Sequence, residues 1–172
     1  MRRYIYLAVL VATALALSII EMSIPLPFIA PGAKLGLSNM VILVTLVLFG
    51  FKDGVLVAVM KSVVLMLATG SISSMLYSLA GSVLSVVVMH IAYKYFNSFL
   101  SIIGVSILGA AAHNFAQITV AALITENIRM YTYLPVLTIV GIFTGYFVGI
   151  SSKYISEHLY KLGVYNLPRR NE

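Results

Sequence analysis

The chain has 172 residues, of which 61% are hydrophobic and 9% are charged, and its mean hydropathy is +1.04. Because a soluble domain is only about 45–50% apolar and about 25% charged, this composition excludes a water-soluble globular protein and indicates one integral membrane domain. The absence of cysteine excludes disulfides, thiolate metal sites and cysteine nucleophiles, and we expect the net charge of +6 to reflect membrane topology rather than a nucleic-acid partner.

Apolar runs long enough to cross, or nearly cross, a lipid bilayer occur about six times along the chain. We predict transmembrane helices over residues 4–24, 34–50, 54–69, 73–96, 99–125 and 131–155. The breaks have turn chemistry: IPLPFIAPGAK is rich in proline, GFKDG places Lys52 and Asp53 between glycines, and ATGSIS is small and polar. Because the second and third runs are short, we expect one of them to be tilted, re-entrant or covered by its neighbours. The predicted fold is an all-α, polytopic membrane bundle that forms a single domain, residues 1–172.

Lysine and arginine are distributed unevenly between the two sides of this predicted bundle. With a cytoplasmic N-terminus, the inner side collects Arg2, Arg3, Lys52, Lys94, Lys153, Lys161, Arg169 and Arg170. The outer side receives only Lys34 and Arg129. Basic residues are enriched on the cytoplasmic side of membrane proteins, so this asymmetry predicts that both termini are cytoplasmic.

The first predicted helix also has the outline of a cleavable signal peptide, because Arg2 and Arg3 precede an apolar run that contains Ala14-Leu15-Ala16. We favour a retained first helix. The later spans already make the chain polytopic, and a first helix can serve as its own insertion signal.

Small residues recur every four positions on the first and last predicted helices. The first series is Ala8, Ala12 and Ala16, and the second is Gly141, Gly145 and Gly149. Residues at this spacing share one helix face, and small side chains there allow another helix to approach closely in lipid. For the glycines we expect packing inside the bundle rather than contact with a partner protein. For the alanines both interpretations stay open.

Two charged residues fall inside predicted spans. Lys61 lies about seven residues from the cytoplasmic start of the third span, which is roughly 10 Å deep by helical rise. Its ammonium either extends back to the inner surface or binds an anion. Glu21 lies near the outer end of the first helix, and both Lys34 and Lys61 are candidates for its partner.

The fifth predicted helix carries the polar sequence AAHNFAQ at residues 111–117. His113 and Gln117 are four residues apart and therefore share a face, and Asn114 lies next to them. Unpaired polar groups are costly in lipid, so this stripe should point into the bundle. Interhelical hydrogen bonds explain any one of the three residues as well as ligand contact does, but for the three together we favour a binding site. An imidazole beside two amides suits a small polar group of a ligand, and the lack of nearby carboxylates and thiolates argues against a metal.

Catalytic patterns are missing from the chain. It contains five acidic residues, Glu21, Asp53, Glu126, Glu157 and Glu172, and these form no cluster that would hold Mg²⁺. There is no phosphate-binding G-x-x-x-x-G-K-[ST] loop, and His113 has no nearby acidic partner in sequence. We therefore expect neither an enzyme nor a bound cofactor. A channel would need polar residues along several helices, which leaves binding or carrier-type passage as the role.

Four stretches of the chain carry a family resemblance. They are EMSIPLPFIAPGAKLGLSNMVIL, MKSVVLMLATGSISSMLYSLAGSVLSVVVM, LGAAAHNFAQITVAAL and YLPVLTIVGIFTGYFVGI. Together they resemble the Gx transporter family, which is often labelled heptaprenyl diphosphate synthase component I. The ordered motifs E-x₃-P, P-G-A-K-L-G-L-x-N and A-x-H-N-x-x-Q are specific, and the resemblance covers essentially the whole chain. Members of this family look like S-components, the substrate-binding subunits of energy-coupling-factor (ECF) vitamin transporters, which are bundles of about six helices.

The resemblance implies roles for individual residues. In S-components, small alanines on the first helix dock on a membrane coupling subunit that two cytosolic ATPases drive, and Ala8, Ala12 and Ala16 match that pattern. The substrate is expected toward the outer half, which would make residues 25–34 a lid. The pocket under this lid would include His113, Asn114, Gln117, Lys34 and Asn39. Lys61 occupies a position where a basic residue is expected. The implied location is a prokaryotic cell membrane, with the lipid bilayer as a constant partner.

Residues and resemblance together predict the substrate-binding subunit of an ATP-driven importer for a small vitamin-like or isoprenoid- or quinone-related molecule. We expect this ligand to be partly apolar and to carry an anionic or strongly polar end that meets Lys34 or Lys61 and the His-Asn-Gln stripe, with Glu21 as a further candidate. The alternative is a non-catalytic membrane accessory subunit of polyprenyl diphosphate or quinone biosynthesis. Prenyl diphosphate synthases rely on aspartate-rich motifs, whereas Asp53 is the single aspartate of this chain.

Overall fold

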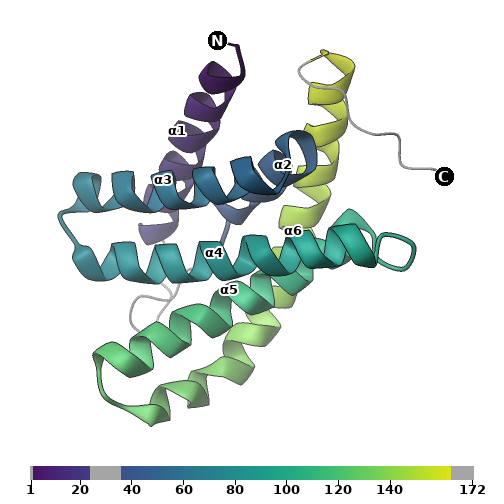
Figure 1. The fold of residues 1–172 in the computed structure, drawn as a ribbon. Coiled ribbons are helices and arrows are strands. Elements are labelled where there is room, and N and C mark those ends of the chain that lie inside the picture. Colours follow the sequence, from purple (N-terminus) through teal and green to yellow (C-terminus); the bar gives the residue numbers. More distant parts are fainter. Residues whose placement is uncertain (1, 24–35, 164–172) are drawn as a thin grey trace.

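The computed structural model describes residues 2–23 and 36–163, and every regular element within these ranges is helical (Figure 1). The elements are α1 (Arg2–Met22), α2 (Asn39–Phe49), α3 (Phe51–Thr69), α4 (Ile72–Tyr95), α5 (Ile102–Ile124), the 3₁₀ helix η1 (Ile128–Tyr133) and α6 (Leu134–Lys161). This confirms the predicted all-α bundle of six helices. The bounds differ most at α2, which begins five residues later than predicted, and at α6, which continues six residues further.

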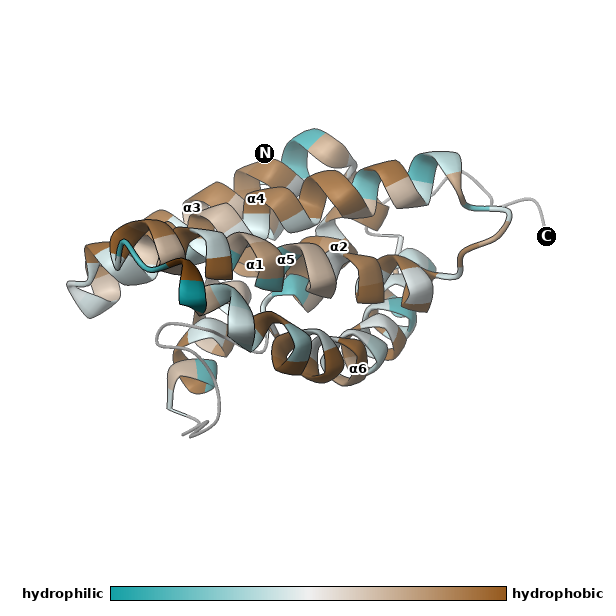
Figure 2. Cartoon of the chain, turned by 90° about the horizontal axis from the view of Figure 1, so that it is seen from below, coloured by the Kyte–Doolittle hydropathy of each residue, from teal (hydrophilic) through white to brown (hydrophobic). Residues whose placement is uncertain are grey.

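Within residues 2–23 and 36–163, four helical segments are long and apolar enough to cross a membrane: Arg3–Met22, Ile72–Tyr95, Ile102–Ile124 and Ile128–Lys161. Hydrophobic residues dominate the helices in Figure 2. On α6, large apolar side chains such as Ile139, Phe143 and Phe147 are exposed, as expected for a surface that faces lipid. We conclude that the chain is a membrane protein.

Helix α2 is the shortest α-helix of the described bundle and lies at its centre. With 11 residues and a rise of 1.5 Å per residue, it is about 16 Å long, too short to cross a hydrocarbon core of about 30 Å. Its residues from Val41 to Leu48 are all buried. Ile42 and Leu46 belong to a core that also contains Val57 of α3. Of the two short segments, α2 is therefore the one that its neighbours cover.

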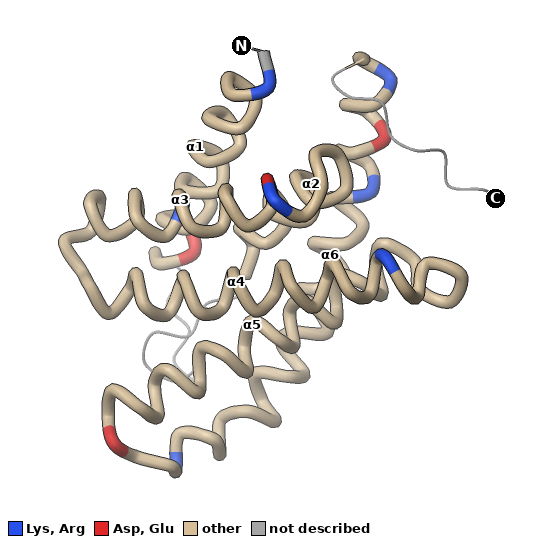
Figure 3. Tube along the Cα trace, in the orientation of Figure 1, with Lys and Arg blue, Asp and Glu red and all other residues tan. Residues whose placement is uncertain are grey.

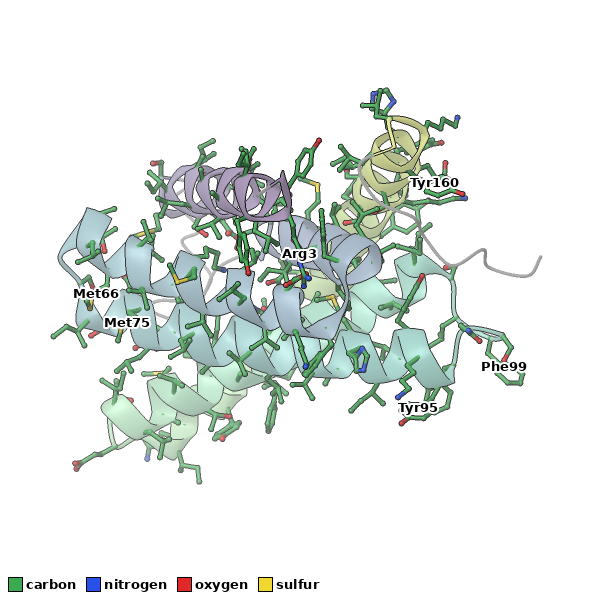
Figure 4. The ribbon with its side chains drawn as sticks, turned by 45° about the horizontal axis from the view of Figure 1, so that its top comes forward. Arg3, Met66, Met75, Tyr95, Phe99 and Tyr160 are labelled. Atoms are coloured by element: carbon green, nitrogen blue, oxygen red, sulfur yellow. The ribbon has the colours of Figure 1, made fainter. Side chains whose placement is uncertain are left out.

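The predicted loop around Lys52 and Asp53 is wrong. Gly50 alone separates α2 from α3, and its φ of 91° is accessible to glycine but strained for other residues. Asp53 lies in the first turn of α3, where a negative charge interacts favourably with the helix dipole. The guanidinium of Arg3, which Figure 4 labels, donates hydrogen bonds of 2.7 to 3.1 Å to both Asp53 carboxylate oxygens. The start of α1 is thus tied to the start of α3.

The glycine series of α6 packs against α5, which confirms the interpretation of internal packing. A Cβ atom at Gly145 would lie 2.9 Å from Cα of Ile107, and one at Gly149 would lie 2.7 Å from Cα of Ile103. Any larger residue would force the two helices apart. Close approach of backbones through small residues is a common form of helix packing in membranes.

Basic residues near the ends of helices lie on two opposite sides of the molecule. The N-terminal end of α1 and the C-terminal end of α6 lie on the same side of the molecule, at the top of Figure 1. Among the described basic residues, Arg3 and Lys161 lie at the ends of α1 and α6 on this side, whereas Arg129 lies in the α5–α6 connection at the opposite end of the molecule (Figure 3). This arrangement agrees with the orientation that the positive-inside rule predicts.

Candidate functional site

Polar side chains converge in the interior of the bundle around the start of α2. They come from the end of α1, the turn at residues 36–39, and the middle of α3, α4 and α5. Four predicted site residues belong to this group: Glu21, Asn39, Lys61 and His113. We call these four, together with Ser38 and Ser82, the polar centre. Each of these four is between 1% and 4% exposed. The structure therefore brings together residues that are up to 92 positions apart in the chain, from Glu21 to His113.

Lys61 is buried in this centre rather than extended to the inner surface. Its Nζ donates hydrogen bonds to the hydroxyl oxygens of Ser38, at 3.0 Å, and Ser82, at 2.8 Å. The side chain is 1% exposed. A buried ammonium is costly unless it is hydrogen-bonded, and these two hydroxyls are among the partners of Lys61. An anionic group brought to this ammonium would be held strongly, because the surroundings have a low dielectric constant.

Glu21 binds the backbone that leads into α2. Its Oε1 accepts hydrogen bonds from the N–H of Gly36 and from the N–H of Leu37, the latter at 3.1 Å. Gly36 has a φ of 80°, and the turn is closed by a 2.9 Å bond from the Asn39 N–H to the Gly36 carbonyl. Successive N–H groups in such a turn form a concave anion-binding site. The next residue, Ser38, is the one that Lys61 contacts, so Glu21 and Lys61 reach the same short segment.

His113 lies between α4 and the start of α2. A Cβ atom at Gly81 would lie 2.7 to 3.0 Å from three atoms of the imidazole, so the ring occupies the space that the glycine leaves open. On the other side, a Cβ atom at Gly36 would lie 3.8 Å from Cδ2 of His113 and 3.0 Å from Nδ2 of Asn39. The imidazole, the Asn39 amide and the turn at residues 36–39 are therefore neighbours.

The Asn39 side chain is 4% exposed, and neither its Oδ1 nor its Nδ2 makes a hydrogen bond within the described part of the chain. A buried amide without partners costs about 1–3 kcal/mol for each unsatisfied group. Asn39 offers one acceptor and two donors to a group that enters the polar centre.

The other two residues of the His-Asn-Gln stripe behave differently from each other. Asn114 Nδ2 donates a 2.7 Å hydrogen bond to the Leu137 carbonyl of α6, and the space above Gly141 accommodates this amide. Asn114 thus joins α5 to α6, as the interhelical interpretation requires, and lies outside the polar centre. Gln117 is 1% exposed and lies one turn beyond His113 on the same face of α5.

Sequence reasoning missed the two serines that hold Lys61. A signal for Ser82 was present, because Ser78, Ser82 and Ser85 follow one another at spacings of four and three residues and therefore line one face of α4. All three are buried, and Ser78 makes a 3.0 Å hydrogen bond to Ser62 of α3. Serine is common in helices of membrane proteins, so this pattern was easily overlooked.

The remaining predicted residues lie outside the polar centre. Lys34 and the proposed lid at residues 25–34 fall outside the described residues. Ala8, Ala12 and Ala16 are all exposed, whereas the face of α1 that packs on the bundle carries Leu7, Ala14, Ser18 and Glu21. The alanine series is therefore not used for packing within the described bundle. Contact with a partner protein remains a prediction.

Comparison with known proteins gives one match. A family model described as heptaprenyl diphosphate synthase component I matches residues 10–155. No curated protein and no solved structure matches the chain. Because the matched region covers most of the sequence, the chain belongs to the heptaprenyl diphosphate synthase component I family, which is Gx-transporter-like.

Proposed function

We propose that the chain is the membrane-embedded substrate-binding subunit of an ECF-type ATP-driven importer, and that the polar centre captures a small molecule through an anionic or strongly polar end. One observation carries this proposal. Lys61 is completely buried among polar groups that come from several helices, beside an Asn39 amide without hydrogen bonds in the described part of the chain.

This arrangement is hard to explain by stability alone. Replacing a buried charge by an apolar residue of similar volume is often neutral or stabilising, so a protein does not need a buried lysine in order to fold. An unsatisfied amide is destabilising as well. Both costs are offset when a ligand supplies an anionic oxygen to Lys61 and a polar group to Asn39. The apolar helices around the centre would contact the rest of a partly apolar ligand, which fits a vitamin-like or isoprenoid- or quinone-related molecule.

The exposed alanine face of α1 supports the proposal that the chain is a subunit of an importer. This face is exposed over three successive turns, and the glycine face of α6 is already used for internal packing. A second helix could approach α1 closely there, because small residues offer little steric resistance. We propose that a membrane coupling subunit binds this face, that two cytosolic ATPases complete the transporter, and that the protein works in a prokaryotic cell membrane.

A second candidate function follows from the family description. The name denotes one component of a heptaprenyl diphosphate synthase, and so a part of a larger assembly. In that case the chain would be a non-catalytic membrane subunit, and the polar centre would hold an isoprenoid head group. The five acidic residues are at least 15 positions apart along the sequence (Glu157 to Glu172), and within the described ranges no group of three His, Asp or Glu could hold a metal.

Purification of the tagged protein from its native membrane in mild detergent distinguishes the two candidate functions. We expect mass spectrometry to identify two ATPases and a membrane coupling subunit with the wild-type protein. Ala12→Leu should abolish their recovery, because the larger side chain projects from the exposed alanine face. Ala68→Leu is the matched control, since Ala68 is an exposed alanine on α3. Recovery of a prenyltransferase in place of the ATPases would contradict the importer proposal and support the synthase component.

A further inference from the structure

The carboxylate of Glu21 occupies a position in which an acidic ligand would be expected. The N–H groups of Gly36 and Leu37 both point at its Oε1, and consecutive backbone N–H groups in a turn are a general anion-binding device. A side-chain carboxylate and the acidic group of a ligand present the same oxygen atoms to such donors. The turn is therefore already filled by an anion from the protein itself.

A second observation points to a ligand at the same place. The Asn39 amide lies over this turn, with Nδ2 3.0 Å from the Cβ position of Gly36, and it is 4% exposed. Neither of its polar atoms has a hydrogen-bond partner in the part of the chain that the structure describes. The donors of the turn, the Asn39 amide and the Lys61 ammonium beside Ser38 together suit a group with two or more negatively charged oxygens.

Glu21 also fixes the outer end of α1. The other end of this helix is held by the Arg3–Asp53 ion pair at 2.7 Å. Between the two ends, only Leu7, Ala14 and Ser18 are buried, and most other positions are exposed. Helix α1 is therefore attached mainly along one narrow strip and at two charged contacts. Loss of the Glu21 contact would release one end of the helix whose opposite face carries the alanines.

We propose that a ligand with a carboxylate or phosphate group displaces the Glu21 carboxylate from the N–H groups of Gly36 and Leu37. Glu21 is then an internal competitor of the ligand, and its displacement loosens α1 when the site is filled. This inference rests on the proposed function, because it assigns the ligand class of the same site. It adds that the ligand controls the helix that presents the alanine face.

The test uses the purified full chain in lipid nanodiscs with three water-soluble probes: benzoate, phenyl phosphate and the neutral analogue benzyl alcohol. Glu21→Gln keeps the size of the side chain but removes its charge, which weakens its hydrogen bonds to the turn. We expect this variant to bind benzoate or phenyl phosphate about tenfold more tightly than the wild type does. Benzyl alcohol should bind neither protein. The stronger of the two acidic probes tells carboxylate from phosphate recognition.

Movement of α1 is measured independently by thiol labelling, because the chain has no cysteine of its own. Ser18→Cys places a thiol at a position of α1 that is 1% exposed. Maleimide should label it at least several-fold faster with the preferred acidic probe present, and faster in the Glu21→Gln background without any probe. Ser85→Cys, at a buried position of α4, is the control and should be unaffected.

Equal or weaker binding of both acidic probes by Glu21→Gln, or no binding of either probe to either protein, would overturn the inference. Labelling of Ser18→Cys that does not change with probe would overturn the coupling to α1. Neither result would affect recovery of the ATPases in the purification experiment, so failure of this inference is distinguishable from failure of the proposed function.

Discussion

Replacing Lys61 by methionine separates the two roles that a buried lysine can have. Methionine is close to lysine in length and volume but carries no charge. The Lys61 ammonium donates hydrogen bonds of 3.0 and 2.8 Å to Ser38 and Ser82, and each bond from a charged donor contributes about 1.5–3 kcal/mol, so the loss of these two bonds removes roughly 3–6 kcal/mol. The variant is also freed from burying an ammonium, which costs several kcal/mol. The two effects nearly cancel, and we expect the free energy of unfolding to change by less than about 2 kcal/mol.

The assay is thermal unfolding of the purified protein in nanodiscs, followed by titration with benzoate and phenyl phosphate. We expect Lys61→Met to unfold near the wild-type temperature but to bind the acidic probes at least tenfold more weakly. Lys61→Ala is the contrasting variant, because the cavity it leaves should cost a further 2–5 kcal/mol or so. If Lys61→Met lost as much stability as Lys61→Ala, or kept its affinity for the acidic probes, the reasoning would be refuted and Lys61 would be a structural residue.

Two further predictions concern Gly81 of α4 and Asn114 of α5. Gly81→Ala places a Cβ atom 2.7 to 3.0 Å from the His113 ring. We expect thermal unfolding to show that the free energy of unfolding falls by about 1–3 kcal/mol, and the acidic probes to bind more weakly. Unchanged stability and probe affinity would mean that His113 does not need its present position. Asn114→Leu removes the 2.7 Å hydrogen bond to α6, so it should destabilise the protein by about 0.6–2 kcal/mol, typical of interhelical bonds in membranes, and leave probe affinity unchanged. Loss of binding in this variant would return Asn114 to the ligand site.

Much of the fold could be predicted because hydropathy reports long apolar helices directly. The α2–α3 junction could not, since a charged pair between glycines is equally typical of a loop and of the first turn of a helix. What decides between them is Arg3, which pairs with Asp53 from 50 residues away, and no local pattern reveals such a contact. The single residue Gly50 makes the tight connection possible through its positive φ.

The sequence indicated which polar residues are buried in the bundle, but not how they are arranged relative to one another. Polar residues within apolar spans are expensive, so Glu21, Lys61 and His113 were recognisable as residues that must face the interior. Their convergence on the start of α2 depends on how the helices pack. Asn114 follows His113 directly and is turned by about 100° around the helix axis, which is enough to direct it to α6. The stripe therefore contributes His113 to the polar centre and Asn114 to the contact between α5 and α6, a division that spacing alone does not determine.

Mass spectrometry of the small molecules released from protein purified out of its native membrane tests directly whether the polar centre binds an acidic ligand. Wild type, Lys61→Met and Asn114→Leu should be compared in parallel. We predict that an acidic small molecule accompanies the wild type and Asn114→Leu and is missing from Lys61→Met. The same small molecules in all three preparations, or an acidic molecule that depends on Asn114 and not on Lys61, would contradict it.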